Sequence, residues 1–207
     1  MPGRRAERLP AALAIVLLLC TGMPSTARDS GPQQKEPDWG IPQLMRELGA
    51  VKRSQAQFVE RKYLKVLNAP LELRGTLTYV APGNLEKRTL SPKPETLTVE
   101  GDRLTIESPA RNERRTLRLQ DYPVLWAFVE SIRSTLGGDI VALQRFYRVE
   151  LEGGPVQWRL YLVPRDKEMR KLISLIRIGG SRDRMDLIEV QEASGDRSVM
   201  KVYEDGR

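Results

Sequence analysis

The sequence predicts an α+β domain in which one large, strongly curved antiparallel sheet carries two helical segments. Apolar and polar residues alternate with a period of two through most of residues 55–204, the pattern of strands with one buried face. Glycine-containing turns separate the alternating runs at the regular spacing of an antiparallel meander. Helical spacing replaces the alternation in two places, residues 38–51 and residues 121–146.

The first helical segment has an expected N-cap at Asp38 and apolar residues on one stripe. We expect an amphipathic helix that lies on an apolar surface. The residues of the stripe are Ile41, Leu44, Met45, Leu48 and Val51.

Residues 71–92 form the first clear hairpin of the predicted sheet. Leu73, Leu77 and Tyr79 face one side of the outgoing strand, and polar residues face the other. After a turn at residues 82–84, the returning strand carries Glu86, Lys87 and Arg88, which offer little apolar surface. The apolar face of the outgoing strand therefore needs another partner.

The later strands follow the same alternation. A hairpin turns at residues 100–102, and a short strand follows within residues 114–120. Beyond residue 146, further strands are separated by turns at residues 153–154, 179–180 and 195–196.

The second helical segment is unusually apolar. Pro123 lies near its start, and Gly137 and Gly138 end its first part. Its first turns are apolar nearly all round, more than a surface helix requires. The apolar residues are Val124, Leu125, Trp126, Phe128, Val129, Ile132 and Leu136.

The N-terminal residues predict export. Residues 1–27 combine three arginines, a short apolar run at 11–19 and small residues before a cleavage point after Ala27, which is typical of a signal peptide. An uncleaved anchor is the alternative, although spanning a bilayer takes ~20 apolar residues. Cys20 follows Leu19, whereas a small residue precedes a lipidated cysteine, so we do not predict lipidation. Residues 28–37 are then a flexible leader and residues 38–207 the domain.

The chain carries a formal net charge of +7. For an exported protein, a basic surface favours anionic lipid head groups or an acidic protein partner, and no nucleic acid is expected. The alternative is that moderate charge only keeps the protein soluble. The basic run at residues 111–118 is expected to protect a strand edge, or else to dock an acidic partner.

Residues for catalysis are scarce. The chain contains no histidine and one cysteine, Cys20, which leaves with the signal peptide; nucleophile–histidine catalysis and the usual zinc sites are thereby excluded. Ser198 and Lys201 match an S-x-x-K pattern but lie in a predicted strand, where positions three apart face opposite sides. Asp183 and Asp186 are interpreted as solvated turn residues. We predict no enzyme, no metal and no cofactor; a hydrolase based on carboxylates remains the alternative and needs a polar pocket.

The many one-sided strands then form either an ordinary core or a cavity that holds an apolar molecule. Residues 55–87, "QAQFVERKYLKVLNAPLELRGTLTYVAPGNLEK", resemble the opening of the LolA-type carriers, and the G-x-L-x-Y step followed by Pro and "NL" is the signature. "SIRSTLGGDIVALQRFY", "VQWRLYLVPRD" and "EASGDRSVM" are similar to a divergent LolA-related branch. The resemblance covers residues 40–203.

The resemblance implies an incompletely closed antiparallel barrel, with helices acting as a lid over a hydrophobic cavity. It implies a periplasmic carrier that shields acylated cargo, a lipoprotein or a glycolipid or other lipid, and delivers it toward the outer membrane without a cofactor. An inner-membrane donor complex and an outer-membrane acceptor are the implied partners. The alternative is a regulatory or sensor module of the same fold that binds a protein partner and lipid without transport.

The resemblance also implies which residues line the cavity, with ordinary core packing as the alternative for each. The lid residues are expected to be Trp126, Phe128, Val129 and Ile132. The expected cavity residues are Leu71, Leu73, Leu77, Tyr79, Leu97, Val99, Leu104, Ile106 and Trp158.

One position departs from the carriers that this sequence resembles. In those carriers a basic residue before the proline of the first hairpin latches the lid through hydrogen bonds, and here that position is Ala81, before Pro82. Lys87 or Arg88 is the expected substitute. The departure favours a glycolipid, an aryl polyene or another acylated envelope molecule over a lipoprotein as the cargo.

Overall fold

The computed structural model describes residues 39–204 of the chain. The predicted signal peptide, the predicted leader and Asp38 lie outside the described residues. The elements in chain order are α1 (Ile41–Ala50), β1 (Arg53–Tyr63), β2 (Leu71–Val80), β3 (Asn84–Ser91), β4 (Glu95–Glu100), β5 (Arg103–Ser108), a 3-10 turn (Pro109–Arg111), β6 (Glu113–Arg118), a second 3-10 turn (Leu119–Asp121), α2 (Pro123–Gly137), α3 (Ile140–Phe146), β7 (Tyr147–Gly154), β8 (Gln157–Pro164), α4 (Lys167–Arg170), β9 (Ile173–Ser181), β10 (Arg184–Glu192) and β11 (Arg197–Glu204).

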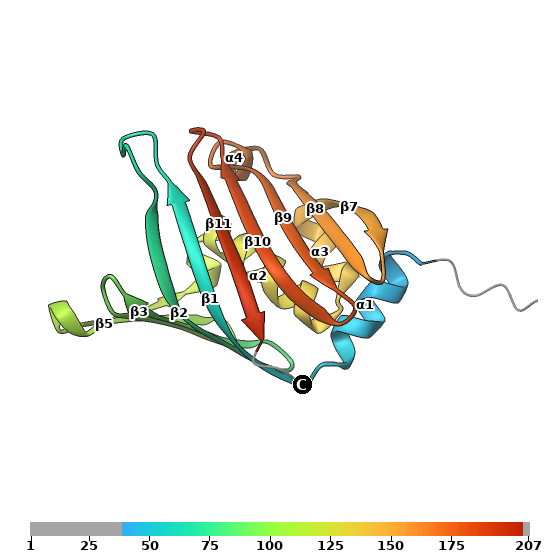
Figure 1. The fold of residues 1–207 in the computed structure, drawn as a ribbon, viewed down its shortest axis with the longest axis horizontal. Coiled ribbons are helices and arrows are strands. Elements are labelled where there is room, and N and C mark those ends of the chain that lie inside the picture. The colour runs from blue at the N-terminus through green and yellow to red at the C-terminus, as the bar shows by residue number, and fades with distance from the viewer. Residues whose placement is uncertain (1–38, 205–207) are drawn as a thin grey trace, which may run out of the picture. The chain divides into compact units, whose positions relative to one another are not determined.

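The eleven strands of residues 39–204 belong to one antiparallel sheet. Their order is β6-β5-β4-β3-β2-β1-β11-β10-β9-β8-β7. Strand β1 pairs with both β2 and β11, so the first and last of these strands lie at the middle of the sheet. Strands β6 and β7 are the two edges, so the sheet formed by the described residues is open. The predicted α+β class with a curved, incompletely closed antiparallel sheet is confirmed (Figure 1).

The sheet bends where β2 meets β3. The register between these strands shifts at Arg74 and Gly75, and a Cβ on Gly75 would lie 1.9 Å from the carbonyl oxygen of Arg88. Glycine is therefore required at this close approach, and it also makes room for the Phe58 ring. In Figure 1, strands β3 and β5 run across the direction of β1 and β2.

The residues at the N-termini of the helices explain where α2 and α3 begin, and they differ from the prediction for α1. Helix α1 follows Gly40 rather than the expected cap Asp38, and it buries Leu44, Met45 and Leu48 of the predicted stripe. Helix α2 starts at Pro123, as predicted. Asp139 caps α3, since its carboxylate accepts a 2.8 Å hydrogen bond from the backbone N–H of Ala142.

Helices α1 and α2 meet at glycines. Gly138 ends α2 with a φ of 70°, a left-handed conformation that favours glycine. A Cβ on Gly138 would lie 2.1 Å from the carbonyl oxygen of Met45 and 3.0 Å from the Cα of Gly49. The end of α2 is thus held against α1 by backbone packing.

Apolar side chains fill two separate clusters on the face of the sheet that carries the helices, which we call the inner face. The larger cluster joins α1, α3 and α4 to β8 and β9, and it includes Leu44, Leu143 and Ile176. The smaller cluster includes Val99 and Leu104 of the bent part of the sheet. Helix α2 contributes to both clusters and crosses the space between them. No helix within residues 39–204 has the length and apolar character needed to cross a membrane.

Candidate functional site

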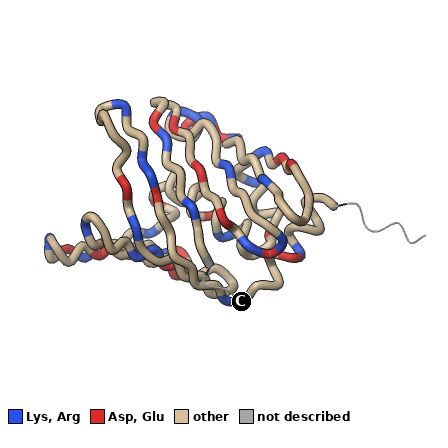
Figure 2. The backbone as a smooth tube through the Cα atoms, viewed as in Figure 1, with Lys and Arg blue, Asp and Glu red and all other residues tan. Residues whose placement is uncertain are grey.

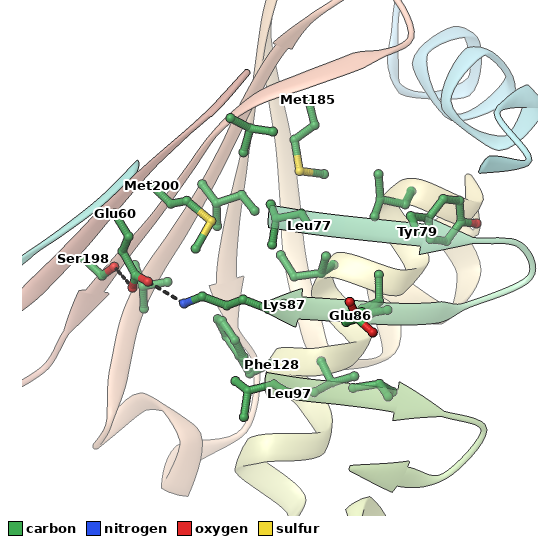
Figure 3. Close-up of a pocket in the computed structure, with 18 of the residues that line it drawn as sticks. Glu60, Leu77, Tyr79, Glu86, Lys87, Leu97, Phe128, Met185, Ser198 and Met200 are labelled. Carbon is green, nitrogen blue, oxygen red and sulfur yellow. Dashed lines mark hydrogen bonds and ion pairs between the residues drawn. The ribbon is translucent and has the colours of Figure 1, made fainter. Parts of the chain in front are cut away.

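A cavity of about 620 Å³ lies between the inner face of the sheet and α2. Its size is within the range of about 300–1,000 Å³ that is usual for ligand pockets. Most of the side chains around it are apolar, and Figure 3 shows Leu77, Leu97 and Phe128 pointing into the same space. The apolar surface of β2 therefore faces a cavity, with α2 on its other side.

Many of the predicted residues line this cavity. Strands β2, β4 and β5 contribute Leu77, Tyr79, Leu97, Val99 and Leu104. Helix α2 contributes Phe128, Val129 and Ile132, the predicted lid residues other than Trp126.

Leu71 and Leu73 do not line the cavity. They share the inner face with Leu77, but the part of β2 that borders the cavity begins at Leu77. Leu71 lies at the start of the strand and is 40% exposed. Alternation predicted the correct face for both residues but not how far the cavity extends along the strand.

Three further predicted residues pack elsewhere. Ile106 and Trp126 join the smaller apolar cluster, and the Trp126 ring meets Phe146 of α3 edge-on at 5.4 Å. Trp158 is buried in the larger cluster, where its indole N–H donates a 2.9 Å hydrogen bond to the carbonyl of Arg182. Side chains of α1 and α3 cover the inner face of the sheet around β8, so Trp158 is a core residue rather than a cavity residue.

One wall of the cavity was not predicted from the sequence. This wall consists of side chains from β10 and β11, which border the cavity because β11 pairs with β1. Alternation places Ile188 and Val190 on one face of β10, but Met185 shares that face only because of the register shift between Met185 and Leu187. The pairing of β11 with β1 was not predicted either. Helix α1 adds Leu48 and Val51, and the wall residues of β10 and β11 are Met185, Ile188, Val190, Met200 and Val202.

A polar cluster interrupts the apolar wall. The Lys87 ammonium donates a 2.5 Å hydrogen bond to Glu60 Oε2, and the Ser198 hydroxyl donates a 2.6 Å bond to Glu60 Oε1 (Figure 3). Lys62 Nζ lies 3.8 Å from Glu60 Oε1. Lys87 Nζ also lies 5.0 Å from the centre of the Phe58 ring, a cation–π contact. Strands β1, β3 and β11 thus bring together a carboxylate, two ammonium groups and a hydroxyl.

The environment of Glu60 keeps its carboxylate ionised. Burial alone would raise the pKa of Glu60, but the charge and hydrogen bond of Lys87, with the hydrogen bond from Ser198, lower it below its usual value. A general acid needs the opposite shift. The cavity is mostly apolar, so its geometry gives the hydrolase alternative no support.

The S-x-x-K pattern is split by the sheet. Ser198 is opposite Lys62 on the inner face, while Lys201 is opposite Val59 and exposed. The two side chains cannot act on one substrate atom. Within the described part of the chain, no group of three or more His, Cys, Asp or Glu residues is arranged to hold a metal ion.

An arginine of α2, rather than a residue of the strand turns, makes the contact between this helix and the turns. Arg133 Nη1 donates a 2.9 Å hydrogen bond to the carbonyl of Gly101, in the β4–β5 turn. Its guanidinium also lies against Gly83 of the β2–β3 turn, where a Cβ would be 2.7 Å from Arg133 Nε. Of the expected substitutes for the latch, Lys87 pairs with Glu60, and Arg88 Nε lies 3.7 Å from Glu86.

The basic run at residues 111–118 includes the edge strand β6. Arg114 pairs with Glu107 at 3.2 Å, and Arg118 pairs with Asp121 at 3.1 Å. Figure 2 shows acidic and basic positions interspersed at this end of the sheet. This arrangement favours protection of the edge over a strongly positive docking patch.

Comparison with solved structures finds distant similarities. A LolA superfamily protein from Nitrosomonas europaea is 11% identical, with a TM-score of 0.42 over 77% of this chain and 89% of that chain. A DUF1329 family protein from Desulfovibrio piger is 11% identical, with a TM-score of 0.44 over 80% and 90% of the two chains. The lipoprotein LppX from Mycobacterium tuberculosis is 8% identical, with a TM-score of 0.41 over 81% and 96%. At these values the similarities support no functional inference.

No curated protein matches the sequence significantly. The family model described as outer membrane lipoprotein carrier protein LolA-like matches residues 32–202, most of the chain. The match includes every residue that lines the cavity. The chain therefore belongs to the LolA-like family of outer membrane lipoprotein carrier proteins.

Proposed function

We propose that this protein is a periplasmic carrier that shields the acyl part of a lipoprotein, glycolipid or other lipid in its cavity and delivers it toward the outer membrane. The observation that carries the proposal is the largely apolar cavity of about 620 Å³ between the open sheet and α2. The LolA-like family description agrees with this activity.

Transfer of an acyl chain through water needs such a cavity. Exposure costs ~0.8 kcal/mol for each CH₂ group, so an unshielded chain does not leave a membrane readily. Leu77, Leu97, Phe128 and Met200 come from different elements and offer apolar contacts on several sides of one space (Figure 3). An acyl chain fits this chemistry better than a polar substrate does.

A carrier must also release its cargo, and the attachment of α2 suits release. The buried Tyr147 hydroxyl donates a 3.0 Å hydrogen bond to the carbonyl of Ala127, and Arg133 contacts Gly101 near the other end of the helix. Helix α2 borders the cavity on one side only, so a displacement of α2 would open it without breaking the sheet ladder.

The cellular setting is part of the proposal. The signal peptide predicted at residues 1–27 supports export, and the periplasm is the compartment that we propose for the mature protein. A carrier there receives cargo from an inner-membrane donor complex and passes it to an outer-membrane acceptor.

Substitution of Leu77 by glutamate tests the carrier function. A carboxylate on the cavity wall, opposite Lys87 in the sheet, should weaken binding of a fluorescent fatty acid at least tenfold, since a charged group that faces an acyl chain must be desolvated. Val129→Glu tests the α2 side of the cavity. Leu90→Glu is the matched control, because Leu90 is on β3 but 58% exposed and outside the cavity.

Binding and thermal unfolding are measured on the same samples. Loss of fatty-acid binding in Leu77→Glu with an unchanged melting temperature supports the proposal. An equal loss of binding and folding would make Leu77 a plain core residue. Unchanged binding would exclude the cavity as the site.

A further inference from the structure

The ion pair between Glu60 and Lys87 lies where the cavity meets solvent. Along the inner face of β1, the side chain of Lys62 is 39% exposed and that of Glu60 is 6% exposed, while Phe58 is 1% exposed. Exposure therefore falls steeply over three successive inward positions. The Lys87 side chain is 23% exposed and reaches Glu60 from β3.

This position is unusual for charged groups. Lys87 is paired in register with Leu77 on one side and Leu97 on the other, and both leucines line the cavity. An ion pair in such a wall costs desolvation free energy, and an apolar pair of similar size is often as stable. Stabilisation of the sheet therefore does not explain why the cluster is charged, and we look for a role in binding.

The charges of the cluster do not cancel. Glu60 contributes one negative charge, whereas Lys62 and Lys87 contribute two positive charges within 3.8 Å of its carboxylate. Outside the cluster, Glu86, Asp183, Glu192 and Arg197 also border the cavity. Glu192 accepts a hydrogen bond from Ser194, Glu86 lies 3.7 Å from Arg88, and the Arg197 guanidinium lies 4.3 Å from the centre of the Tyr63 ring. Both oxygens of Glu60 already have donors, Ser198 and Lys87. An ammonium carries three N–H groups, so the lysines can bind a further anion.

We propose that Lys62 and Lys87 bind the anionic head group of an amphiphile, a carboxylate or a phosphate monoester, whose acyl tail occupies the cavity. Glu60 and Ser198 position the Lys87 ammonium at the boundary between apolar wall and solvent. This inference rests on the proposed carrier function and adds the chemical class of the head group.

Chain-matched amphiphiles test the inference directly. The full mature protein, freed of bound lipid, is titrated with laurate, dodecyl phosphate, dodecanol and dodecyltrimethylammonium, each below its micelle concentration. We expect one or both anions to bind about tenfold more tightly than dodecanol, the scale of one charge-assisted hydrogen bond. Preference for laurate indicates a fatty acid, and preference for dodecyl phosphate indicates a phosphorylated lipid.

Three variants separate recognition from folding. Lys87→Met should reduce the preference for anions over dodecanol, with Lys62 still in place. Glu60→Gln should increase anion affinity, because Lys87 is then no longer neutralised. The triple variant Glu60→Gln/Lys62→Met/Lys87→Met removes all three charges of the cluster and should show no preference for anions. It replaces Lys87→Met if that variant does not fold. Lys201→Met is the control, since Lys201 is on the outer face of β11.

The outcomes distinguish the two proposals. Equal affinity for all four amphiphiles, or tighter binding of dodecyltrimethylammonium, would overturn the head-group site and leave the carrier function standing. A preference for anions that survives in the triple variant would also overturn it. Failure of every amphiphile, dodecanol included, would overturn the carrier function itself.

Discussion

Glu60 is a buried carboxylate in the wall of a largely apolar cavity, and its ionisation links the stability of the protein to pH. The folded state lowers the pKa of Glu60 below its ordinary value of 4.5. A lowered pKa means that the ion pair with Lys87 stabilises the fold above pH 4.5, and that this contribution is lost as the pH falls toward the folded pKa.

Glu60→Gln tests this linkage. At neutral pH the variant should unfold with a free energy about 1–3 kcal/mol lower than the wild type, because the Lys87 ammonium loses its charged partner. The difference should shrink as the pH falls from 4.5 toward the lower pKa of folded Glu60, because the unfolded chain takes up this proton first. Urea denaturation across this pH range measures it. A difference that does not change with pH would show that the charge of Glu60 contributes nothing to stability.

Part of this arrangement can be predicted from the sequence. Ala56, Phe58 and Glu60 alternate along β1, so the sequence places a charged side chain at an inward position. The pairing of Glu60 with Lys87 cannot be predicted in this way, because it crosses β2 and depends on the bend at Gly75. Side-chain periodicity reports the face of a strand, whereas a contact between strands two positions apart in the sheet depends on register and curvature.

Helix α2 is the element that can open the cavity, and Arg133 connects it to the strand turns. Arg133→Met should raise the dissociation rate of a fluorescent fatty acid about fivefold or more, since the helix loses a charge-assisted hydrogen bond to Gly101. Stopped-flow displacement measures the rate.

Arg88→Met is the matched control for this experiment, because Arg88 is exposed and 3.7 Å from Glu86 rather than near α2. A dissociation rate that is the same in Arg133→Met and the wild type would mean that this contact does not limit release.

The close packing of α1 on the end of α2 gives a second prediction for this helix. Gly138→Ala should lower the free energy of unfolding by more than ~1–2 kcal/mol, the cost of a left-handed non-glycine residue, because the new Cβ also meets the carbonyl of Met45. Thermal unfolding measures the loss. Gly154→Ala is a suitable control, since a Cβ there has nothing within 4 Å. Equal stability of both variants would contradict the observed packing.

The sequence predicted where α2 begins and ends better than it predicted which face of α2 borders the cavity. Pro123 and Gly138 marked the boundaries of α2 through their backbone preferences. The face of α2 that borders the cavity could not be read, because its first turns are apolar all round. Trp126 therefore packs on α3 while Phe128 lines the cavity.

At the scale of the molecule, the alternation and the turns predicted a single curved antiparallel sheet. They did not predict that β11 pairs with β1, which joins strands from opposite ends of the chain. That pairing supplies the wall containing Met200 and Val202. A non-local pairing leaves no mark on local periodicity, so this half of the cavity was missed.

Mass spectrometry can identify the cargo in a solvent extract of mature protein that is purified from its own periplasm without detergent. If the protein is a carrier, the wild-type extract should contain a stoichiometric acylated molecule, and the Leu77→Glu extract should lack it. An empty wild-type protein that also takes up no fluorescent fatty acid would contradict the carrier function and favour a module that binds a protein partner.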